Sequence, residues 1–383
     1  MKNDIIAELK KWLSDGNEIA IYCAGTHGVI YFNILNNLGI KISAFVDNDI
    51  RKIGNKVEGI KCIAPKEIAG NTKFKVIICS GIEKYKLIHD LAISQGIIDI
   101  IDFRKIIDDL IINYREEYLD TIIKQYSEIP ADPFYTFEVE SFNNFDKPNE
   151  CLTGKIAVYT GLFGDYDDFI EPTVYPSNVD YYYISDYKSE KIKKCVWLNA
   201  ETIIPENIIS PIKRNRYVKM HPHLIFPNYR YSIYIDANIQ IIKDPTEMIC
   251  ESVTGISGFH HPKRDCLYYE ALTVVNHKRV DPMDIVKQIK RYLTEGMPIH
   301  FGLTELPFIA REHNKKKCID IMETWWEEFD CGAQRDQISF PYALWKNKVS
   351  VQDIAILGNN VRDNEYLCFR NHYNESKRIK NTI

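Results

Sequence analysis

Strand-like and helix-like segments alternate along residues 18–103, and this alternation limits the fold more than any other feature of the chain. Apolar runs that end in turn residues indicate strands at 18–24, 41–47, 73–80 and 97–103. Apolar residues at helical spacing indicate helices at 28–39 and 83–96. Strands that alternate with helices are typical of an open parallel sheet. We therefore predict an α/β protein that begins with a small Rossmann-like domain.

A chain of 383 residues exceeds the usual size of one domain. Residues 106–126 carry an apolar stripe at helical spacing, and this helix packs on the Rossmann-like domain or pairs with a second copy of the chain. A polar, proline-punctuated stretch follows and marks a boundary. We predict three parts: a Rossmann-like domain at 1–105, a connecting helix and linker at 106–150, and a second α/β domain at 151–383.

Composition excludes several classes of protein. A formal net charge of -5 gives no electrostatic case for binding nucleic acid. The N-terminus has no apolar signal region, and no stretch approaches the apolar length of a membrane span. The ten cysteines show no paired metal-ligand spacing, so we expect neither a zinc site nor a disulfide framework. We expect a cytoplasmic protein, and peripheral attachment at the inner membrane face is also compatible with the sequence.

The turn after the first strand has features of a nucleotide site. Gly25 and Gly28 follow the strand, and Asp47 ends the second strand about twenty residues later. In dinucleotide-binding domains such glycines admit a phosphate, and the acidic residue accepts from a ribose hydroxyl. The alternative is that the two glycines only permit a tight strand-to-helix turn.

A second site is indicated within residues 229–245, where an apolar strand ends in Asp236, Ala237 and Asn238. Hard cations such as Mg²⁺ or Mn²⁺ prefer oxygen ligands and readily share their shell with a substrate diphosphate. Asp236 and Asn238 would supply two such oxygens, one residue apart. The alternative is that Asp and Asn only turn the chain, because both side chains bond their own backbone at strand ends.

Two further strands of the second domain end in residues suited to a nucleotide. The strand that starts at Lys155 runs into a loop rich in Gly and Asp, and the strand at 180–186 ends in an aspartate. Ligands of open α/β sheets bind at such strand ends. We propose four residues for the base and ribose of a donor, although ordinary strand termination would give the same pattern: Tyr159, Thr160, Gly161 and Asp186.

A basic run at 213–219 precedes the Asp236 strand. A diphosphate carries more negative charge than one metal ion offsets, and positive side chains near the metal would neutralise the rest. Lys219 is the first candidate and Arg216 the second. Many basic runs are only solvated surface, but this one leads into an apolar strand and does not end in a tail.

Several segments occur in an order that resembles a known family. They are KMHPHLIFP, YSIYIDANIQIIKDP, FHHPKRDCLYYEA, REHN and RDQISF. Together they span roughly residues 155–345 and resemble the glycosyltransferase-like family that includes plant proteins of mucilage synthesis. The stretch AGTHG, followed by FVDND, resembles the small nucleotide-binding-like domains appended to bacterial sugar-modifying enzymes. The first resemblance implies a GT-A type fold and glycosyl transfer, and the second implies surface-polysaccharide assembly.

The resemblance also implies roles for residues. Asp236 and Asn238 match the metal motif, although many sugar transferases have a second Asp where this chain has an amide. His261 and Arg264 match a His-x-x-Arg motif that we assign to the donor. Glu305 matches the acidic residue of a Pro-Glu-Gly stretch, with Leu306 in place of Gly, and we include it among the catalytic residues.

Two late segments complete the expected site. Asp336 begins a predicted helix, where a carboxylate would be exposed to a cleft and could deprotonate an acceptor hydroxyl. Arg335 beside it could clamp a phosphate or carboxylate. The alternative is that Asp336 is an N-terminal cap. His372, near the C-terminus, is the candidate third metal ligand, with His300 and His313 as alternatives.

The leading hypothesis is a glycosyltransferase that uses Mn²⁺ or Mg²⁺ to move a sugar from a nucleotide-diphosphate donor, expected to be a UDP-sugar, to a glycan or lipid-linked acceptor. One alternative is an NAD(P)-dependent sugar-nucleotide oxidoreductase or epimerase built on the Rossmann-like domain. Another is a non-catalytic protein that binds a sugar nucleotide. Self-association is compatible with all three.

Overall fold

The computed structural model describes residues 4–80, 84–113, 119–128, 152–164 and 169–370. The chain forms two compact units. The first comprises Met1–Phe137 and Ala271–Ile299, and the second comprises Glu138–Glu270 and His300–Ile383. This corrects the contiguous division that we predicted from the sequence, because the expected domain at 151–383 is interrupted by a segment that belongs to the first unit.

The first unit is built on a mostly parallel sheet. In its described residues six strands lie in the order β3-β4-β2-β1-β5-β6, with β3 antiparallel to β4 and the other pairs parallel. This confirms the predicted α/β class. The strands are β1 (Glu18–Tyr22), β2 (Ala44–Val46), β3 (Lys56–Val57), β4 (Ile60–Ile63), β5 (Phe74–Ile78) and β6 (Ile100–Asp102).

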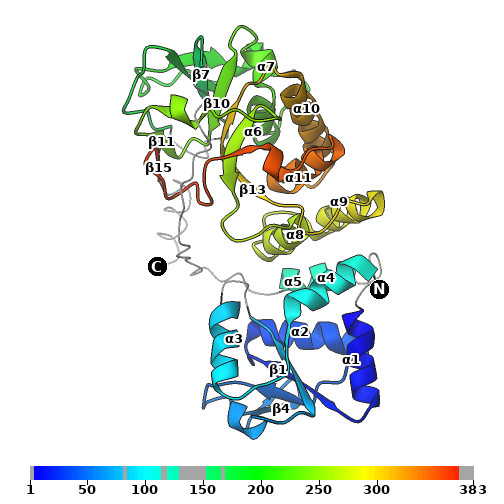
Figure 1. The fold of residues 1–383 in the computed structure, drawn as a ribbon. Coiled ribbons are helices and arrows are strands. Elements are labelled where there is room, and N and C mark those ends of the chain that lie inside the picture. The colour runs from blue at the N-terminus through cyan, green and yellow to red at the C-terminus, as the bar shows by residue number, and fades with distance from the viewer. Residues whose placement is uncertain (1–3, 81–83, 114–118, 129–151, 165–168, 371–383) are drawn as a thin grey trace. The chain divides into compact units, whose positions relative to one another are not determined.

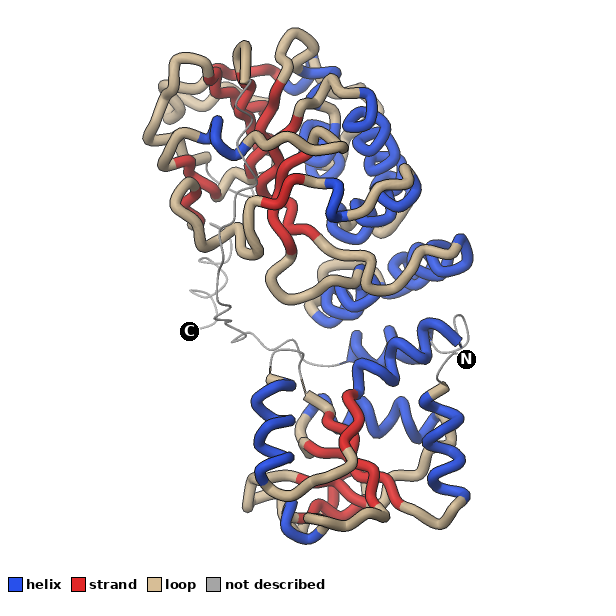
Figure 2. Tube along the Cα trace, in the orientation of Figure 1, coloured by secondary structure: helices blue, strands red, loops and turns tan. Residues whose placement is uncertain are grey.

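Helices lie on either side of these strands (Figure 2). They are α1 (Ile5–Ser14), α2 (Thr26–Asn37), α3 (Tyr85–Ser94), α4 (Phe103–Asn113) and α5 (Leu119–Glu128), with a short 3-10 turn η1 (Pro65–Glu67). Residues 106–126 were predicted as one helix. The structure has α4 and α5 in this region, and residues 114–118 between them lie outside the described part. The buried side chains of Ile107, Leu110 and Ile122 confirm that the apolar stripe packs within the protein.

The interrupting segment contains α9 (Pro282–Glu295), which packs against α5 of the first unit. Its start is set by Asp281, whose side chain accepts from the Met283 amide, and its end by Gly296 in the left-handed conformation. Its apolar face is buried, and Lys290 Nζ pairs with Asp120 at 2.8 Å. The helix α8 (Leu267–Asn276) starts in the second unit and ends in the first.

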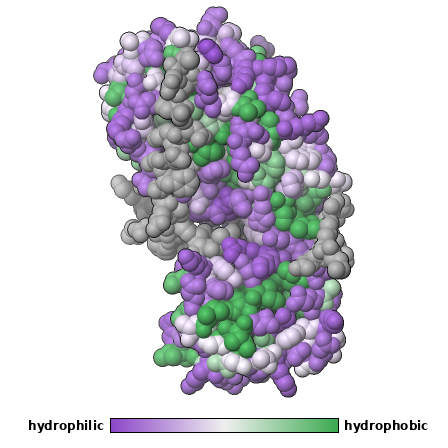
Figure 3. Space-filling view, in the orientation of Figure 1, coloured by the Kyte–Doolittle hydropathy of each residue, from purple (hydrophilic) through white to green (hydrophobic). Residues whose placement is uncertain are grey.

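The outer side of α3 exposes apolar side chains. Hydrophobic residues also gather on the face of the first unit drawn in Figure 3. Such surface is compatible with the self-association predicted from the sequence, which stays a prediction. The exposed apolar residues of α3 and the turn after it are Leu87, Leu91, Ile93 and Ile98.

The second unit has a larger mixed sheet. Seven strands of its described residues lie in the order β14-β12-β13-β10-β7-β8-β9. β13 is antiparallel to both neighbours, and the other pairs are parallel. The strands are β7 (Ile156–Leu162), β8 (Val179–Ser185), β9 (Val196–Asn199), β10 (Tyr231–Ile235), β12 (Ile256–His260), β13 (Thr304–Arg311) and β14 (Ala355–Ile356).

Each face of this sheet has its own cover (Figure 1). Alternation along β10 sends Ile233 and Ile235 into a core with β11 (Ile239–Ile241) and β15 (Leu367–Phe369), whereas Tyr234 points into the core on the opposite face. That opposite face is covered by helices. They are α6 (Pro211–Met220), α7 (Pro222–Ile225), α10 (Lys316–Cys331) and α11 (Asp336–Lys346). The second unit also has three short 3-10 turns, η2 (Ala200–Thr202), η3 (Pro245–Met248) and η4 (Val351–Asp353).

Across the described ranges, no helix combines the length and the apolar character needed to cross a bilayer.

Candidate functional site

The strand directions bring the predicted site residues of the second unit to one edge of its sheet. β7, β10 and β12 run in the same direction, so their carboxyl ends meet there, together with the amino end of the antiparallel β13. Asp236 follows β10 directly, and its amide donates to the Pro307 carbonyl at 2.8 Å, which extends the pairing of β10 with β13. Glu305, the second residue of β13, lies two residues before Pro307. The sheet therefore gathers carboxylates from distant parts of the sequence.

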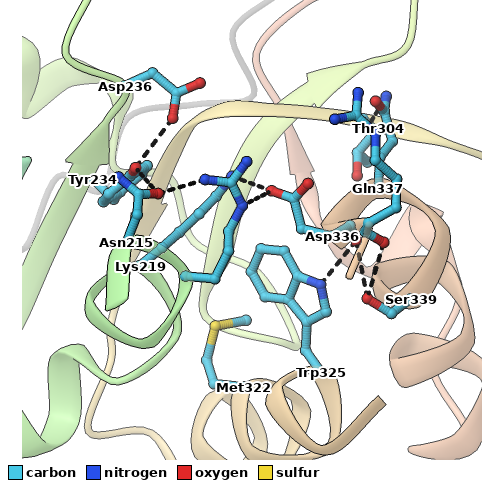
Figure 4. Close-up of polar contacts among 12 residues, drawn as sticks. Asn215, Lys219, Tyr234, Asp236, Thr304, Met322, Trp325, Asp336, Gln337 and Ser339 are labelled. Carbon is cyan, nitrogen blue, oxygen red and sulfur yellow. Dashed lines mark hydrogen bonds and ion pairs between the residues drawn. The ribbon is translucent and has the colours of Figure 1, made fainter. Parts of the chain in front are cut away.

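A polar network starts at Asp236 and runs beneath this edge (Figure 4). The Tyr234 hydroxyl lies 3.1 Å from Asp236 Oδ1 and 3.2 Å from Asn215 Oδ1, so it can donate to either oxygen. Burial raises the pKa of Tyr234 well above its ordinary value, which keeps this hydroxyl protonated. Asn215 in turn donates from Nδ2 to the Gly161 carbonyl at 3.0 Å, and its Oδ1 accepts from the Arg216 guanidinium. The network thus joins the ends of β7 and β10 to α6.

Asp336 is the centre of a buried charge cluster. Its Oδ2 lies 2.7 Å from Lys219 Nζ and 2.9 Å from Arg216 Nε. The Trp325 indole nitrogen donates to the Asp336 carbonyl at 2.9 Å and fixes the start of α11. Burial alone would raise the pKa of Asp336, but the charges of Arg216, Lys219 and Arg335 hold it far below its ordinary range. Two cations share one carboxylate, so the cluster keeps positive charge that an anionic ligand could offset.

These contacts correct two predictions. Asp336 is the first residue of α11 with Arg335 at the cap position, so it is not the N-terminal cap. The charges of Arg216 and Lys219 disfavour its protonation, and its predicted role as the base stays a prediction. The Lys219 side chain is only 2% exposed, whereas that of Arg216 is 22% exposed. The expected order of accessibility is therefore reversed: Arg216 is the more exposed of the two cations, and Lys219 pairs with Asp336 in the interior.

A second charged cluster lies where β12 ends and β13 begins. Glu270 accepts from Arg264 Nε at 2.7 Å, and Arg264 NH2 lies 3.1 Å from His261 Nε2. The His261 Nδ1 accepts from the amides of residues 263 and 264, which closes the turn after β12. Burial lowers the pKa of His261 to about 2, so the ring is neutral. His261 and Arg264, predicted to bind donor, are thus engaged with each other and with Glu270.

Glu305 is held differently. Both of its carboxylate oxygens accept from the same Arg362 nitrogen, NH1, at 2.7 and 3.0 Å. The Arg362 side chain is 58% exposed, whereas the Glu305 side chain is 10% exposed. Burial raises the pKa of Glu305 against the opposing charge of Arg362. Asp336 and Glu305 are the two carboxylates predicted as catalytic. The pKa of Asp336 is therefore lower than that of an ordinary carboxylic acid, and the pKa of Glu305 is higher.

The expected metal ligands are only partly within the described chain. Asp236 Oδ1 contacts the Tyr234 hydroxyl, and Asn238 donates from Nδ2 to the Arg370 carbonyl at 3.0 Å. His372 lies outside the described residues. No group of three His, Cys, Asp or Glu side chains suited to a metal ion occurs in the part of the chain that the structure describes. A site made by Asp236 and Asn238 would need a substrate to complete its shell, which is how Mg²⁺ is commonly held.

The predicted nucleotide residues on β7 and β8 divide into two groups. Tyr159 is 1% exposed, and its hydroxyl accepts from Arg311 NH2 at 2.7 Å, so it packs within the core and does not face a ligand. This corrects its assignment. Gly161 and Thr160 lie at the carboxyl end of β7, and Thr160 Oγ1 is buried without a partner among the described residues. Asp186 pairs with Arg214 at 2.8 Å and is one-third exposed.

The turn predicted to bind a nucleotide in the first unit is tightly closed. A Cβ at Gly28 would lie 1.9 Å from the Cys23 carbonyl oxygen, so only glycine fits there. Cys23 has a positive φ of 86°, which few non-glycine residues adopt. Asp47 Oδ2 accepts from the Ala24 amide at 2.8 Å and from Lys52 Nζ at 2.9 Å. Asp47 therefore fastens the turn, as expected if the motif has a conformational role. Gly25, the helix cap, has no such crowding.

Sequence reasoning missed Asn215, Tyr234 and Arg362. Asn215 and Tyr234 lie within segments that we had singled out, but their contacts depend on how α6 lies across β7 and β10. Arg362 lies between β14 and β15, in a stretch with no recognisable motif, and only the folded chain brings it to Glu305.

A crystal structure of RSP, a Rex-family repressor, is 19% identical in sequence to the matched part of this chain, at a TM-score of 0.20. The match covers 25% of this chain and 50% of that chain. The apo structure of the WbbM bifunctional glycosyltransferase is 10% identical in sequence to the matched part of this chain, at a TM-score of 0.33. The match covers 57% of this chain and 40% of that chain. Residues 16–107 match the model described as C2185-like, N-terminal. The resemblance of this part to domains of bacterial sugar-modifying enzymes stays a prediction.

The chain has a plant relative. "Probable hexosyltransferase MUCI70" from Arabidopsis thaliana is 27% identical over 219 residues, which cover 48% of this chain and 36% of that protein. This chain therefore matches little more than a third of the length of that relative. Residues 137–369, which are more than half of the chain, match the model of the TOD1/MUCI70 glycosyltransferase-like domain. This match confirms the resemblance predicted from the sequence, and the chain belongs to the TOD1/MUCI70 glycosyltransferase-like family.

Proposed function

We propose that the protein transfers a sugar from a nucleotide-diphosphate donor, expected to be a UDP-sugar, to the hydroxyl of a glycan or lipid-linked acceptor. Family membership supports glycosyl transfer as the reaction class. The observation that carries the proposal is the network that links Asp236, through Tyr234 and Asn215, to the partly exposed guanidinium of Arg216. A carboxylate and a guanidinium held together at a sheet edge suit a ligand that combines a metal ion with phosphates.

Asp236 and Asn238 would hold Mn²⁺ or Mg²⁺, because a carboxylate and an amide supply the oxygen atoms that these ions prefer. When bound, the metal would neutralise the negative charge that develops on the departing diphosphate. Tyr234 positions Asp236 by hydrogen bonding to Oδ1. Because burial keeps the Tyr234 hydroxyl protonated, it can donate to Asp236 Oδ1.

Arg216 and Arg335 would bind the diphosphate directly. Arg216 is already oriented by Asp336 and Asn215, so little side-chain freedom is lost when a phosphate binds. Arg335 Nε is buried without a partner among the described residues, whereas Thr160 is fully buried and, like Tyr159, does not face a ligand. Buried donors that lack a partner are rare in folded proteins, and a bound donor substrate would supply an acceptor for Arg335 Nε.

The pathway follows from the predicted relationship of the first unit to domains of sugar-modifying enzymes. We propose a role in bacterial-type surface-polysaccharide synthesis, at the cytoplasmic face of the membrane. Asp186 with Arg214 near the carboxyl end of β8, and His261 with Arg264 after β12, would border the donor on its two sides.

Thermal unfolding of the purified protein tests this function. The protein is heated with UDP-, GDP- or CDP-sugars, and separately with NAD(P)H, with and without Mn²⁺. A ligand at about 100 times its dissociation constant stabilises the folded state by about 2.7 kcal/mol, which the assay resolves. The expected result is a Mn²⁺-dependent rise with one nucleotide sugar that is absent in Asp236→Ala. A rise with NAD(P)H alone would move the activity to the first unit and refute the proposal.

The same variant is then assayed for transfer. Asp236→Ala is expected to lower turnover by at least about 10²-fold, because electrostatic stabilisation of the leaving group is lost. The melting temperature of this variant without ligand serves as the folding control. Near-wild-type turnover would show that Asp236 does not hold a metal needed for the reaction.

A further inference from the structure

Two buried carboxylates of the candidate site, Glu270 and Glu305, are neutralised by their arginine partners in different ways. Glu270 is bound by two nitrogens of Arg264, at 2.7 and 2.6 Å, and the Arg264 side chain is only 13% exposed. Glu305 is bound by a single nitrogen of Arg362, whose side chain is 58% exposed. A buried guanidinium cannot leave its partner without a large cost, whereas an exposed one can move into water. Glu305 is therefore the carboxylate whose partner can be displaced.

Glu305 also lies in the right part of the edge. It pairs with Phe259 in the ladder between β12 and β13. Two residues farther along β13, the Pro307 carbonyl accepts from the amide of Asp236. Two residues of a strand span about 7 Å. A group bound at Asp236 would thus lie at a distance from Glu305 that one sugar ring can roughly span.

The charged groups that face Glu305 come from three elements. Arg362 lies in the loop between β14 and β15, Glu270 lies on α8, and Arg264 with His261 lies in the turn after β12. Glu270 and Arg264 largely neutralise each other, and the His261 ring is uncharged. Arg362 is consequently the group that decides whether Glu305 is neutralised or free to act.

We infer that Glu305 takes the proton of the acceptor hydroxyl, and that the acceptor displaces Arg362 from Glu305 when it binds. This inference rests on the proposed function. The acceptor oxygen forms a bond to the anomeric carbon of the donor, the bond from that carbon to the diphosphate breaks, and the proton passes to a Glu305 oxygen. The diphosphate leaves with the electron pair. A single displacement of this kind inverts the anomeric configuration, and Arg362 acts as a positioning residue for the base.

The first test compares Glu305→Gln and Glu305→Ala with Glu270→Gln, which removes a similar buried carboxylate from the same edge. Donor binding is followed by Mn²⁺-dependent thermal shift, and transfer by product formation. Glu305→Gln should bind donor as the wild type does but turn over roughly 10²- to 10⁴-fold more slowly. Formate should restore transfer in Glu305→Ala and have no effect on Glu270→Gln. Wild-type turnover in Glu305→Gln, or no rescue by formate in a folded Glu305→Ala, would overturn the inference.

The second test needs no variant at a buried position. The anomeric configuration of the wild-type product is compared with that of the donor by NMR. Inversion is expected, and retention would refute a single displacement aided by Glu305. If the wild type neither binds nor turns over any nucleotide sugar, the proposed function itself fails, and this outcome is distinct from either result for Glu305.

The third test concerns Arg362, whose exposed side chain can be changed with little risk to folding. Removing its positive charge disfavours the ionised form of Glu305. In Arg362→Ala, the acidic limb of the pH profile of kcat/KM should therefore move to higher pH, while Arg362→Lys keeps it in place. Glu312→Gln, which removes the partner of Arg230 at the opposite end of β13, is the control for an ion pair remote from Glu305 and should not move the limb. An unchanged limb in Arg362→Ala would show that Arg362 does not control the base.

Discussion

Lys219 Nζ lies 2.7 Å from Asp336 Oδ2, and the two side chains are 2% and 8% exposed. The residues are 117 positions apart, so this contact ties α6 to the first turn of α11. Arg216 Nε reaches the same oxygen from the solvent side. Asp336 is thus the counter-ion around which the positive side of the candidate site is organised.

Replacing Asp336 should reduce stability more than an ordinary surface change. Asp336→Asn leaves two cations without their shared anion, and breaking a buried pair in this way costs about 3–5 kcal/mol. Urea unfolding measures the loss. Asp320→Asn, which removes the exposed partner of Lys316 on α10, is the matched control and should cost less than about 1 kcal/mol. Equal losses in the two variants would contradict the counter-ion role.

Arg216 and Lys219 should separate into a binding residue and a structural residue. Arg216→Ala removes a partly exposed guanidinium and is expected to weaken donor binding roughly 10- to 100-fold, as for the loss of a charged hydrogen bond. Lys219→Met should lower stability and leave the affinity of the folded protein for donor nearly unchanged. Titration of donor against both variants checks this. A larger loss of affinity in Lys219→Met would restore the order predicted from the sequence.

The turn of the first unit should tolerate a methyl group at one glycine and not at the other. Gly28→Ala places a Cβ 1.9 Å from the Cys23 carbonyl oxygen, and relieving this overlap should cost about 1–3 kcal/mol or more. Gly25→Ala is the control, since its Cβ would meet only Lys52 Nζ at 4.0 Å. Denaturant unfolding of both variants measures the difference. Similar stabilities would show that the backbone of the turn can shift.

Stability should depend on pH through His313. Burial lowers the pKa of His313 to about 4 in the folded protein, whereas an unfolded histidine titrates near about 6.5. Between these values the unfolded state binds more protons, so stability falls as the pH drops from about 6.5 toward 4. His313→Asn should flatten this dependence by about one proton, or up to about 1.4 kcal/mol per pH unit.

The control for this pH prediction is Cys318→Ala, a change at a fully buried position of the same unit. Burial raises the pKa of Cys318 to about 12, so the thiol stays protonated throughout the acidic range. This variant should lose stability by the same amount at each pH. A slope unchanged in His313→Asn would exclude His313 as a source of the acid sensitivity.

The sequence predicted the α/β class and the strands well, because a buried parallel strand needs a continuous apolar run and such runs are visible in any sequence. It also located Asp236, since a carboxylate directly after such a strand must lie at the sheet edge. The partners of these residues were harder to predict. Asp336 was expected to be exposed because it begins a helix, but the packing of α11 on α6 buried it against Lys219. Burial of this kind depends on tertiary contacts that local pattern does not report.

Tyr159 is a second residue whose surroundings could not be predicted from the sequence alone. It lies on β7 before Thr160 and Gly161, which reach the edge, and position along the strand alone gives no reason to separate it from them. Its side chain enters the core between Phe226 and Tyr234 and contacts the buried Arg311. The direction of a side chain from a buried strand depends on which face each neighbouring helix covers.

The chain leaves the second unit after Glu270, supplies α9 to the first, and returns at His300 just before β13. No single cut in the sequence can therefore yield both units intact. A truncation that removes residues 1–137 would strip α9 of its partner α5 and expose its apolar face. Isolating the glycosyltransferase-like unit would require a second operation, in which residues 271–299 are excised and a short linker joins Glu270 to His300.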